Sequence, residues 1–259
     1  RGHKVVLLEK DAELGGHLKT LAKLPTRTEW AVGIENLTKP LARLGVDVRL
    51  NHEATPDVLR SGSPDTVVIA TGSRWGKSGF SQFTPGRPGI PGAEQANVID
   101  MGTAAKRAVS DPSSFGKRVL IFDESAGYWP LGVGEVLLDA GCQVDYVTPH
   151  MFLGEDTLKT GDFPHNIPRL QGKGATIAAQ LMIDRIDGGD VHLFGVWGAP
   201  AEVRTGYDTI VLAQMKEPAD ELYFAVRGDH PEVHRVGDAV APRRLEAVMY
   251  EAEKLGREI

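Results

Sequence analysis

Near the start of the chain lies a near-continuous apolar run, Val5–Leu8, that ends on an acidic residue, Glu9. A run without polar alternation is typical of a strand that is buried on both faces of a parallel sheet. Gly15 and Gly16 follow a few residues later, in a segment with loop character. The beginning of the chain therefore predicts a parallel sheet with a glycine-containing loop behind one strand.

The remainder of the chain alternates short apolar runs with segments of helical periodicity. We expect helices over residues 29–44, 132–140 and 242–259. We expect strands over residues 46–50, 66–70, 117–122, 143–148 and 209–213, and further short elements over 167–172, 176–186, 189–196 and 233–240. Strands that alternate with helices predict an α/β fold with mainly parallel sheets.

A stretch rich in glycine and proline, residues 76–92, separates two such α/β series. Segments of this composition often connect domains, because few contacts cross them. We therefore expect two domains. The first comprises residues 1–95 with 226–259, and the second comprises residues 96–225.

Composition excludes several classes of function. The net charge is −6 with both signs interspersed, so the chain lacks the basic surface of a nucleic-acid-binding protein. No apolar run approaches the roughly 20 residues of a membrane helix, and no signal-peptide pattern opens the sequence. We expect a cytoplasmic protein with no nucleic-acid or membrane partner, although an upstream targeting segment stays open.

The side chains that could carry chemistry are few. With one cysteine, Cys142, the chain can form neither an internal disulfide nor a cysteine-ligated iron–sulfur cluster, and we expect a buried structural thiol. The eight histidines show no metal-ligand spacing, and no nucleophile motif or catalytic acid pair stands out. The sequence therefore predicts no metal site and no catalytic residue.

Three short segments have the chemistry of a nucleotide site. An acid at a strand end, such as Glu9, can accept hydrogen bonds from both adenosine ribose hydroxyls and repel a 2′-phosphate. The run Ala70-Thr71-Gly72 follows a buried strand and allows close approach of the backbone to a cofactor. Gly237-Asp238 precedes the last helix, where amides attract anions and an acid can bind a sugar hydroxyl. Taken singly, an acid at a strand end is more typical of an ordinary buried strand with a solvated glutamate, and the Ala-Thr-Gly run is equally typical of a simple turn. The alternative for Asp238 is a helix cap.

The order and spacing of these segments, with Gly15-Gly16, resemble the glutathione-reductase-like flavoproteins, which have two dinucleotide-binding domains. A closer resemblance is to the C-terminal half of the trimethylamine dehydrogenase, histamine dehydrogenase and 2,4-dienoyl-CoA reductase family. It covers nearly the whole chain, and the runs that carry it are Glu9-Lys10, Gly15–Leu18, Leu24–Trp30, Asn51–Ala54, Ile90–Gly92 and Gly237–Arg244. The implied fold is two Rossmann-like FAD/NAD(P)-binding domains, the first without its N-terminal β-α unit.

The resemblance also implies roles for individual residues. Glu9, followed by Lys10, would bind ribose, and Gly16, His17 and Leu18 would lie near the pyrophosphate. Arg27 matches a basic position that could contact phosphate, and the backbone of Ala54 matches a position that meets adenine.

The family also has an N-terminal flavin barrel of old-yellow-enzyme type, with FMN and a [4Fe–4S] cluster. The resemblance implies this barrel as a partner, in the same polypeptide or another, together with an electron-transfer protein and a homo-oligomeric state.

Two departures from the family pattern matter. The first Rossmann strand and its G-x-G-x-x-G turn are absent before residue 1, which would leave a bare strand edge and little to hold phosphate. In the second domain the equivalent turn contains Asp123, Glu124, Tyr128, Trp129 and Pro130. Two carboxylates would repel a pyrophosphate, so we expect no NAD(P)H there. The alternative for the two acids is an exposed turn with no role. For Tyr128 and Trp129 we favour packing against the neighbouring domain.

Three hypotheses follow. The first is the ADP- or FAD-binding portion of an amine-dehydrogenase-like flavin oxidoreductase, incompetent for catalysis alone, with electrons passing from FMN through an iron–sulfur cluster outside this chain. The second is a non-catalytic nucleotide-binding or docking subunit that another polypeptide completes. The third is an NAD(P)H-dependent FAD reductase of the dienoyl-CoA reductase type, which the second turn disfavours. A fragment or cleaved product is expected, with a separately encoded subunit as the alternative.

Overall fold

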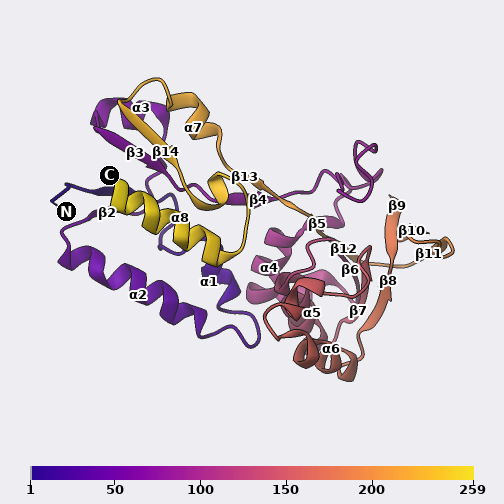
Figure 1. Cartoon of the computed structure of the whole chain (residues 1–259). Coiled ribbons are helices and arrows are strands. Elements are labelled where there is room, and N and C mark those ends of the chain that lie inside the picture. The colour runs from indigo at the N-terminus through magenta and orange to yellow at the C-terminus, as the bar shows by residue number, and fades with distance from the viewer. Residues whose placement is uncertain (1) are drawn as a thin grey trace. The chain divides into compact units, whose positions relative to one another are not determined.

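The computed structural model describes residues 2–259 and divides the chain into two compact units (Figure 1). The first unit runs to Ala22, resumes over Glu29–Arg74 and closes with Lys216–Ile259, whereas the second comprises Lys23–Thr28 and Trp75–Met215. Residues 23–28 and 75–95 thus lie in the second unit rather than the first, and residues 216–225 lie in the first rather than the second. The glycine- and proline-rich stretch is not a free connector, because Gly79 and Gln82 bind side chains of the second unit.

The first unit is built on short parallel strand pairs. Its elements are β1 (Val6–Leu8), α1 (His17–Leu21), α2 (Trp30–Arg43), β2 (Asp47–Arg49), α3 (Pro56–Gly62), β3 (Thr66–Ile69), the start of β4 (Ser73–Trp75), β13 (Lys216–Pro218), α7 (Glu221–Val226), β14 (Glu232–Arg235), η3 (Gly237–Ala239) and α8 (Leu245–Glu258). Strand β1 pairs with β2, and β3 pairs with β14, both in parallel. Among the described residues these pairs form two separate two-stranded sheets, and β4 pairs with β13.

This unit buries little apolar surface. One core cluster consists of Val67, Ile69, Val226 and Ala239. Val5 and Val6 remain 45% and 44% exposed, so the prediction that their run is buried on both faces is wrong for these residues. The physical reason is that, within residues 2–259, β1 belongs to a sheet of two strands, which is too narrow for helices to cover both of its faces. A parallel strand is normally covered on both faces and paired at both edges.

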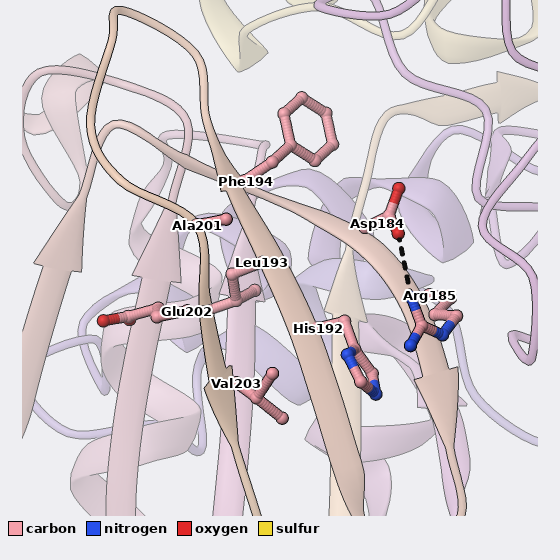
Figure 2. Close-up of a pocket in the computed structure, with 8 residues that line it drawn as sticks. All are labelled: Asp184, Arg185, His192, Leu193, Phe194, Ala201, Glu202 and Val203. Atoms are coloured by element: carbon pink, nitrogen blue, oxygen red, sulfur yellow. Dashed lines mark hydrogen bonds and ion pairs between the residues drawn. The ribbon is translucent and has the colours of Figure 1, made fainter.

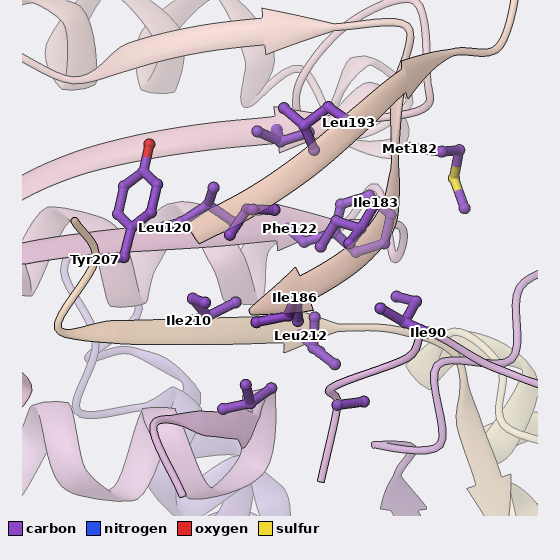
Figure 3. Packing of buried hydrophobic residues seen from close by; sticks show 14 of the residues in the cluster. Ile90, Leu120, Phe122, Met182, Ile183, Ile186, Leu193, Tyr207, Ile210 and Leu212 are labelled. Atoms are coloured by element: carbon purple, nitrogen blue, oxygen red, sulfur yellow. The ribbon is translucent and has the colours of Figure 1, made fainter. Parts of the chain in front are cut away.

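The second unit has a complete α/β core. Its elements are β5 (Val98–Asp100), α4 (Met101–Ser110), η1 (Pro112–Phe115), β6 (Arg118–Asp123), α5 (Tyr128–Asp139), β7 (Gln143–Thr148), η2 (Glu155–Leu158), α6 (Phe163–Gly172), β8 (Thr176–Ala179), β9 (Leu181–Asp187), β10 (Asp190–Gly195), β11 (Glu202–Arg204) and β12 (Thr209–Ala213). Five parallel strands pair in the order β5-β12-β6-β7-β8. A three-stranded antiparallel sheet, β11-β10-β9, packs its apolar side chains against them (Figure 3).

The α/β class is confirmed, with two differences in detail. Helix α5 begins at Tyr128 rather than near Gly132, because Pro130 is tolerated in a first helical turn. The antiparallel sheet was not expected, since its alternating residues resemble any half-buried strand. None of the helices within residues 2–259 combines the length and apolar character that a bilayer-spanning helix needs.

Candidate functional site

Glu9 follows the carboxyl end of β1, where the backbone fixes its position. Its N–H donates to Arg49 O at 3.0 Å, and its carbonyl accepts the His52 N–H at 2.8 Å. Its carboxylate accepts the Asp11 N–H at 2.9 Å through Oε1. The side chain is half-buried. Ligands of open parallel sheets bind at this end of the strands, and Glu9 lies at this end of β1.

The loop after Glu9 leaves the backbone accessible at one glycine. Gly16 has φ +51°, and a Cβ built on it would meet nothing within 4 Å. At Gly15, with φ +117°, a Cβ would come within 3.1 Å of Ile34. Lys10 is exposed, and His17 and Leu18 open the short helix α1. The chain therefore turns tightly at Gly15 and presents open backbone at Gly16.

Ala54 lies at the same strand end as Glu9. It is half-buried and follows His52, whose N–H binds the Glu9 carbonyl. Thr55 then caps α3 by accepting the Val58 N–H at 3.3 Å. The structure thus places Ala54 two residues beyond the residue that hydrogen-bonds to the Glu9 carbonyl.

Ala70, Thr71 and Gly72 follow β3. Gly72 has φ +77°, and a Cβ there would meet nothing within 4 Å. Its carbonyl accepts the Ala219 N–H at 2.9 Å, and the Thr71 hydroxyl donates to the Ala219 carbonyl. Part of this turn's hydrogen-bonding capacity is therefore used by the chain itself.

Gly237 and Asp238 follow β14, and both bind neighbouring groups of the first unit. The Gly237 N–H donates to Glu251 Oε2 at 2.6 Å. Asp238 accepts the Ser73 hydroxyl at 2.8 Å and the Arg243 N–H at 3.1 Å, and Lys216 Nζ lies 3.7 Å away. Asp238 does not cap the last helix, because Arg244 holds that position.

Burial lowers the pKa of the Lys216 ammonium, an effect that the neighbouring Asp238 carboxylate opposes. The pair is therefore partly removed from solvent, and the Asp238 carboxylate already balances a positive charge of this chain.

Arg27 lies in the second unit, where its guanidinium is bound by the chain. It pairs with Asp162 at 2.9 Å and lies 3.7 Å from the ring centre of Tyr128. It also donates to the Thr26 carbonyl at 3.1 Å. The structure assigns these contacts within the second unit, whereas the other candidate residues lie in the first.

The turn after β6 differs from an exposed turn, because both of its acids are buried. Asp123 is 0% exposed and accepts the Ala126 and Gly154 N–H groups at 2.9 and 3.2 Å. Burial raises its pKa to about 6, and these hydrogen bonds oppose the rise. Burial also raises the pKa of Glu124, which accepts the Ser81 hydroxyl at 2.7 Å. No local sequence pattern indicates these tertiary partners, because Ser81 and Gly154 are distant in sequence from the turn.

A hollow of about 390 Å³ lies on the antiparallel sheet of the second unit (Figure 2). Asp184, Arg185 and His192 contribute polar groups, but Asp184 is already paired with Arg87 at 2.7 Å and with Arg185 at 3.3 Å. No sequence-predicted residue lines it. Within residues 2–259, no group of three or more His, Cys, Asp or Glu side chains is arranged to hold a metal ion.

No protein-family model matches the chain. Among curated proteins, a probable N-methylproline demethylase of Rhizobium meliloti (strain 1021) is 26% identical, covering 100% of this chain and 40% of that protein. A dimethylamine dehydrogenase of Hyphomicrobium sp. (strain x) is also 26% identical, covering 100% of this chain and 39% of that protein. The chain spans about 40% of the length of these relatives.

Solved structures show the same fold. Histamine dehydrogenase from Rhizobium sp. 4-9 superposes with a TM-score of 0.91 at 23% identity, covering 100% of this chain and 40% of that one. A 2-naphthoyl-CoA reductase complex superposes with a TM-score of 0.84 at 23% identity, covering 100% of this chain and 36% of that one. Other reductases superpose less closely, with TM-scores of 0.59 for an NAD-dependent persulfide reductase from A. fulgidus and 0.60 for a flavoprotein disulfide reductase from Escherichia coli.

Proposed function

We propose that the first unit binds ADP or the ADP half of FAD, because the whole chain is similar to about 40% of a probable N-methylproline demethylase, a dimethylamine dehydrogenase and a histamine dehydrogenase. The relatives are flavin oxidoreductases, dehydrogenases and reductases, and this chain is a partial homologue of them. The observation that carries the proposal is the Glu9 carboxylate, held at the carboxyl end of a parallel strand.

The residues of the first unit fit the adenosine half of such a nucleotide. Glu9 would accept hydrogen bonds from the ribose hydroxyls, and the Ala54 backbone would meet the adenine. Gly16 is open enough for close approach of a phosphate-bearing chain. Asp238 and the Gly237 N–H already bind Ser73 and Glu251, which leaves them less capacity for a ligand.

The phosphate half requires groups beyond those described. Backbone N–H groups of a glycine-rich turn, the usual pyrophosphate cradle, would have to come from a strand beside β1. Within residues 2–259 that edge of β1 carries no partner strand. We infer that a further β-α segment completes the first unit, from the same polypeptide or from another.

In the intact enzyme we place substrate oxidation outside this chain. FMN in an N-terminal barrel would accept the substrate's electrons, and a [4Fe–4S] cluster would pass them to an external carrier. The chain's own residues would hold a nucleotide and contribute no catalytic group.

The docking-subunit alternative rests on the unpaired edge of β1 and the exposed Val5 and Val6. The coding sequence upstream of this chain distinguishes the two alternatives. One reading frame that continues upstream into a barrel with a cysteine cluster motif supports the flavin oxidoreductase over the docking subunit. The reductase alternative is disfavoured because Asp123 and Glu124 are buried where a second dinucleotide would bind.

Release of bound nucleotide from the full-length protein, followed by mass analysis, tests the proposal. We expect one adenine nucleotide per chain, and its mass distinguishes ADP from FAD. Full-length protein with no adenine nucleotide would contradict the role of Glu9.

A further inference from the structure

The turn between β6 and α5, residues Asp123–Pro130, binds several segments of its own chain. In a nucleotide-binding unit this position faces a ligand, because it joins a parallel strand to the following helix. Here Glu124, Tyr128 and Trp129 make their contacts with residues distant in sequence. We call residues Asp123–Pro130 the anchor turn.

Tyr128 holds the segment Lys23–Thr28. Its hydroxyl donates to the Pro25 carbonyl and lies 3.4 Å from Thr26 Oγ1. Its ring carries the Arg27 guanidinium at 3.7 Å, a cation–π distance. This short segment belongs to the second unit, although the residues on both sides of it belong to the first.

Trp129 contacts the point at which the chain enters the second unit again. Its ring meets Trp75 edge-on, with centroids 5.9 Å apart and planes at 70°. Trp75 is the first residue of the second unit after Arg74. The next residue, Gly76, donates its N–H to the carbonyl of Met215, the last residue before the chain leaves that unit.

Glu124 holds the loop that follows this entry point. Besides the Ser81 hydroxyl, it accepts the Gln82 N–H at 3.0 Å. Gln214, 2% exposed and one residue before Met215, bonds to Glu124 at 3.4 Å and accepts the Gly79 N–H at 3.0 Å. The same buried carboxylate therefore binds residues beside the entry and the exit of the chain.

We propose that the anchor turn holds the connections between the two units in place of a dinucleotide. The chain passes between the units beside Lys23, Thr28, Arg74 and Met215, and each of these positions lies within or directly next to a segment that the turn or its hydrogen-bonded partners bind. The connections are thereby fastened at their second-unit ends. This inference does not depend on nucleotide binding at Glu9.

The test compares Tyr128→Ala and Tyr128→Phe with Tyr250→Phe, a control at an exposed tyrosine of α8. Phenylalanine retains the ring beneath Arg27 but removes the hydroxyl that binds Pro25, so it isolates the hydrogen bond if alanine perturbs the fold. Backbone hydrogen exchange over residues 23–28 reports whether Tyr128 holds this segment in place. The width of the distance distribution between spin labels at Lys254→Cys in the first unit and Trp197→Cys in the second reports whether this fastening restricts the connections.

We expect Tyr128→Ala to speed exchange over residues 23–28 by on the order of tenfold, because a hydrogen bond and a cation–π contact are lost. We expect the label distribution to broaden in Tyr128→Ala, to broaden less in Tyr128→Phe, and to stay unchanged in Tyr250→Phe. If exchange accelerates while the distribution keeps its width in both Tyr128 variants, the turn holds only a local segment and the proposal is wrong.

Discussion

The Ser73 hydroxyl donates a 2.8 Å hydrogen bond to the carboxylate of Asp238, and this bond joins the segment after β3 to the segment after β14. Ser73 is buried, and Lys216 lies beside the same carboxylate. The two strand ends of the predicted nucleotide site are therefore held by a charge-assisted bond within the first unit.

Removing that bond should destabilise the first unit. We expect Ser73→Ala to lower the free energy of unfolding by about 1.5–3 kcal/mol, the range for a hydrogen bond to a charged group. Ser61→Ala, on the exposed surface of α3, is the matched control and should change it by less than about 0.5 kcal/mol. Urea unfolding followed by circular dichroism measures both. An equal change in the free energy of unfolding for the two variants would contradict a structural role of the Ser73–Asp238 pair.

The buried carboxyl of Asp123 should make stability depend on pH. Its pKa is raised to about 6 in the folded protein, against 3.8 for an unperturbed carboxyl, so the folded state holds its proton more tightly. The stability contribution is therefore present at low pH and is lost as the pH rises through about 6.

Asp123→Asn removes this titration. Between pH 4.5 and pH 7.5 the unmodified chain should lose stability while the variant does not, so the free energy of unfolding of the variant relative to the unmodified chain should increase. Lost hydrogen bonds shift this difference by a constant amount and do not change its direction. Urea unfolding at the two pH values measures the difference. A relative stability that is constant or falls over this interval would show that the pKa of Asp123 is not raised in the folded protein.

An ion cluster between α5 and α6 should be essential to the second unit. Glu135 is 3% exposed and receives two bonds from Arg169, at 2.7 and 2.8 Å, and one from Lys173 at 3.0 Å. Burial opposes ionisation of Glu135, but the hydrogen bonds from Arg169 and Lys173 outweigh it and hold its pKa below the ordinary value.

We expect Glu135→Ala to cost about 3–5 kcal/mol, because Arg169 loses its partner in a partly buried position. Glu246→Ala, at an exposed glutamate of α8, should cost little. Thermal unfolding of both variants gives the comparison, and a mild effect of Glu135→Ala would mean that solvent replaces the carboxylate without penalty.

The sequence predicted the elements whose signals are local. Strands β7 and β12 match their predicted bounds, because β-branched and aromatic residues concentrate in them and turn residues flank them. The prediction that Val5 and Val6 are buried was wrong, because their burial depends on the elements that pack around the strand and not on the apolar run itself. The partners of Glu124 and Tyr128 could not be foreseen, since Ser81 and Pro25 are distant in sequence.

The candidate site shows the same division. The order of strands in the sequence predicted that Glu9, Ala70 and Gly237 follow strand ends. The hydrogen bonds that the Asp238 carboxylate accepts from Ser73 and Arg243 could not be predicted, because they depend on the path of the chain after β14. The role predicted for Arg27 as a phosphate contact stays a prediction, and the structure adds its pairing with Asp162.

The most direct measurement of the central proposal is a calorimetric titration of ADP and of 2′-phospho-ADP into the full-length protein after its bound nucleotide has been removed, and into its Glu9→Gln and Glu13→Gln variants treated in the same way. Glu13 is an exposed acid of the same loop and serves as the control. We predict that Glu9→Gln weakens ADP binding on the order of tenfold or more, improves 2′-phospho-ADP relative to ADP, and that Glu13→Gln changes neither. Equal ADP affinity in Glu9→Gln and the unmodified protein would contradict the proposal that Glu9 binds the ribose.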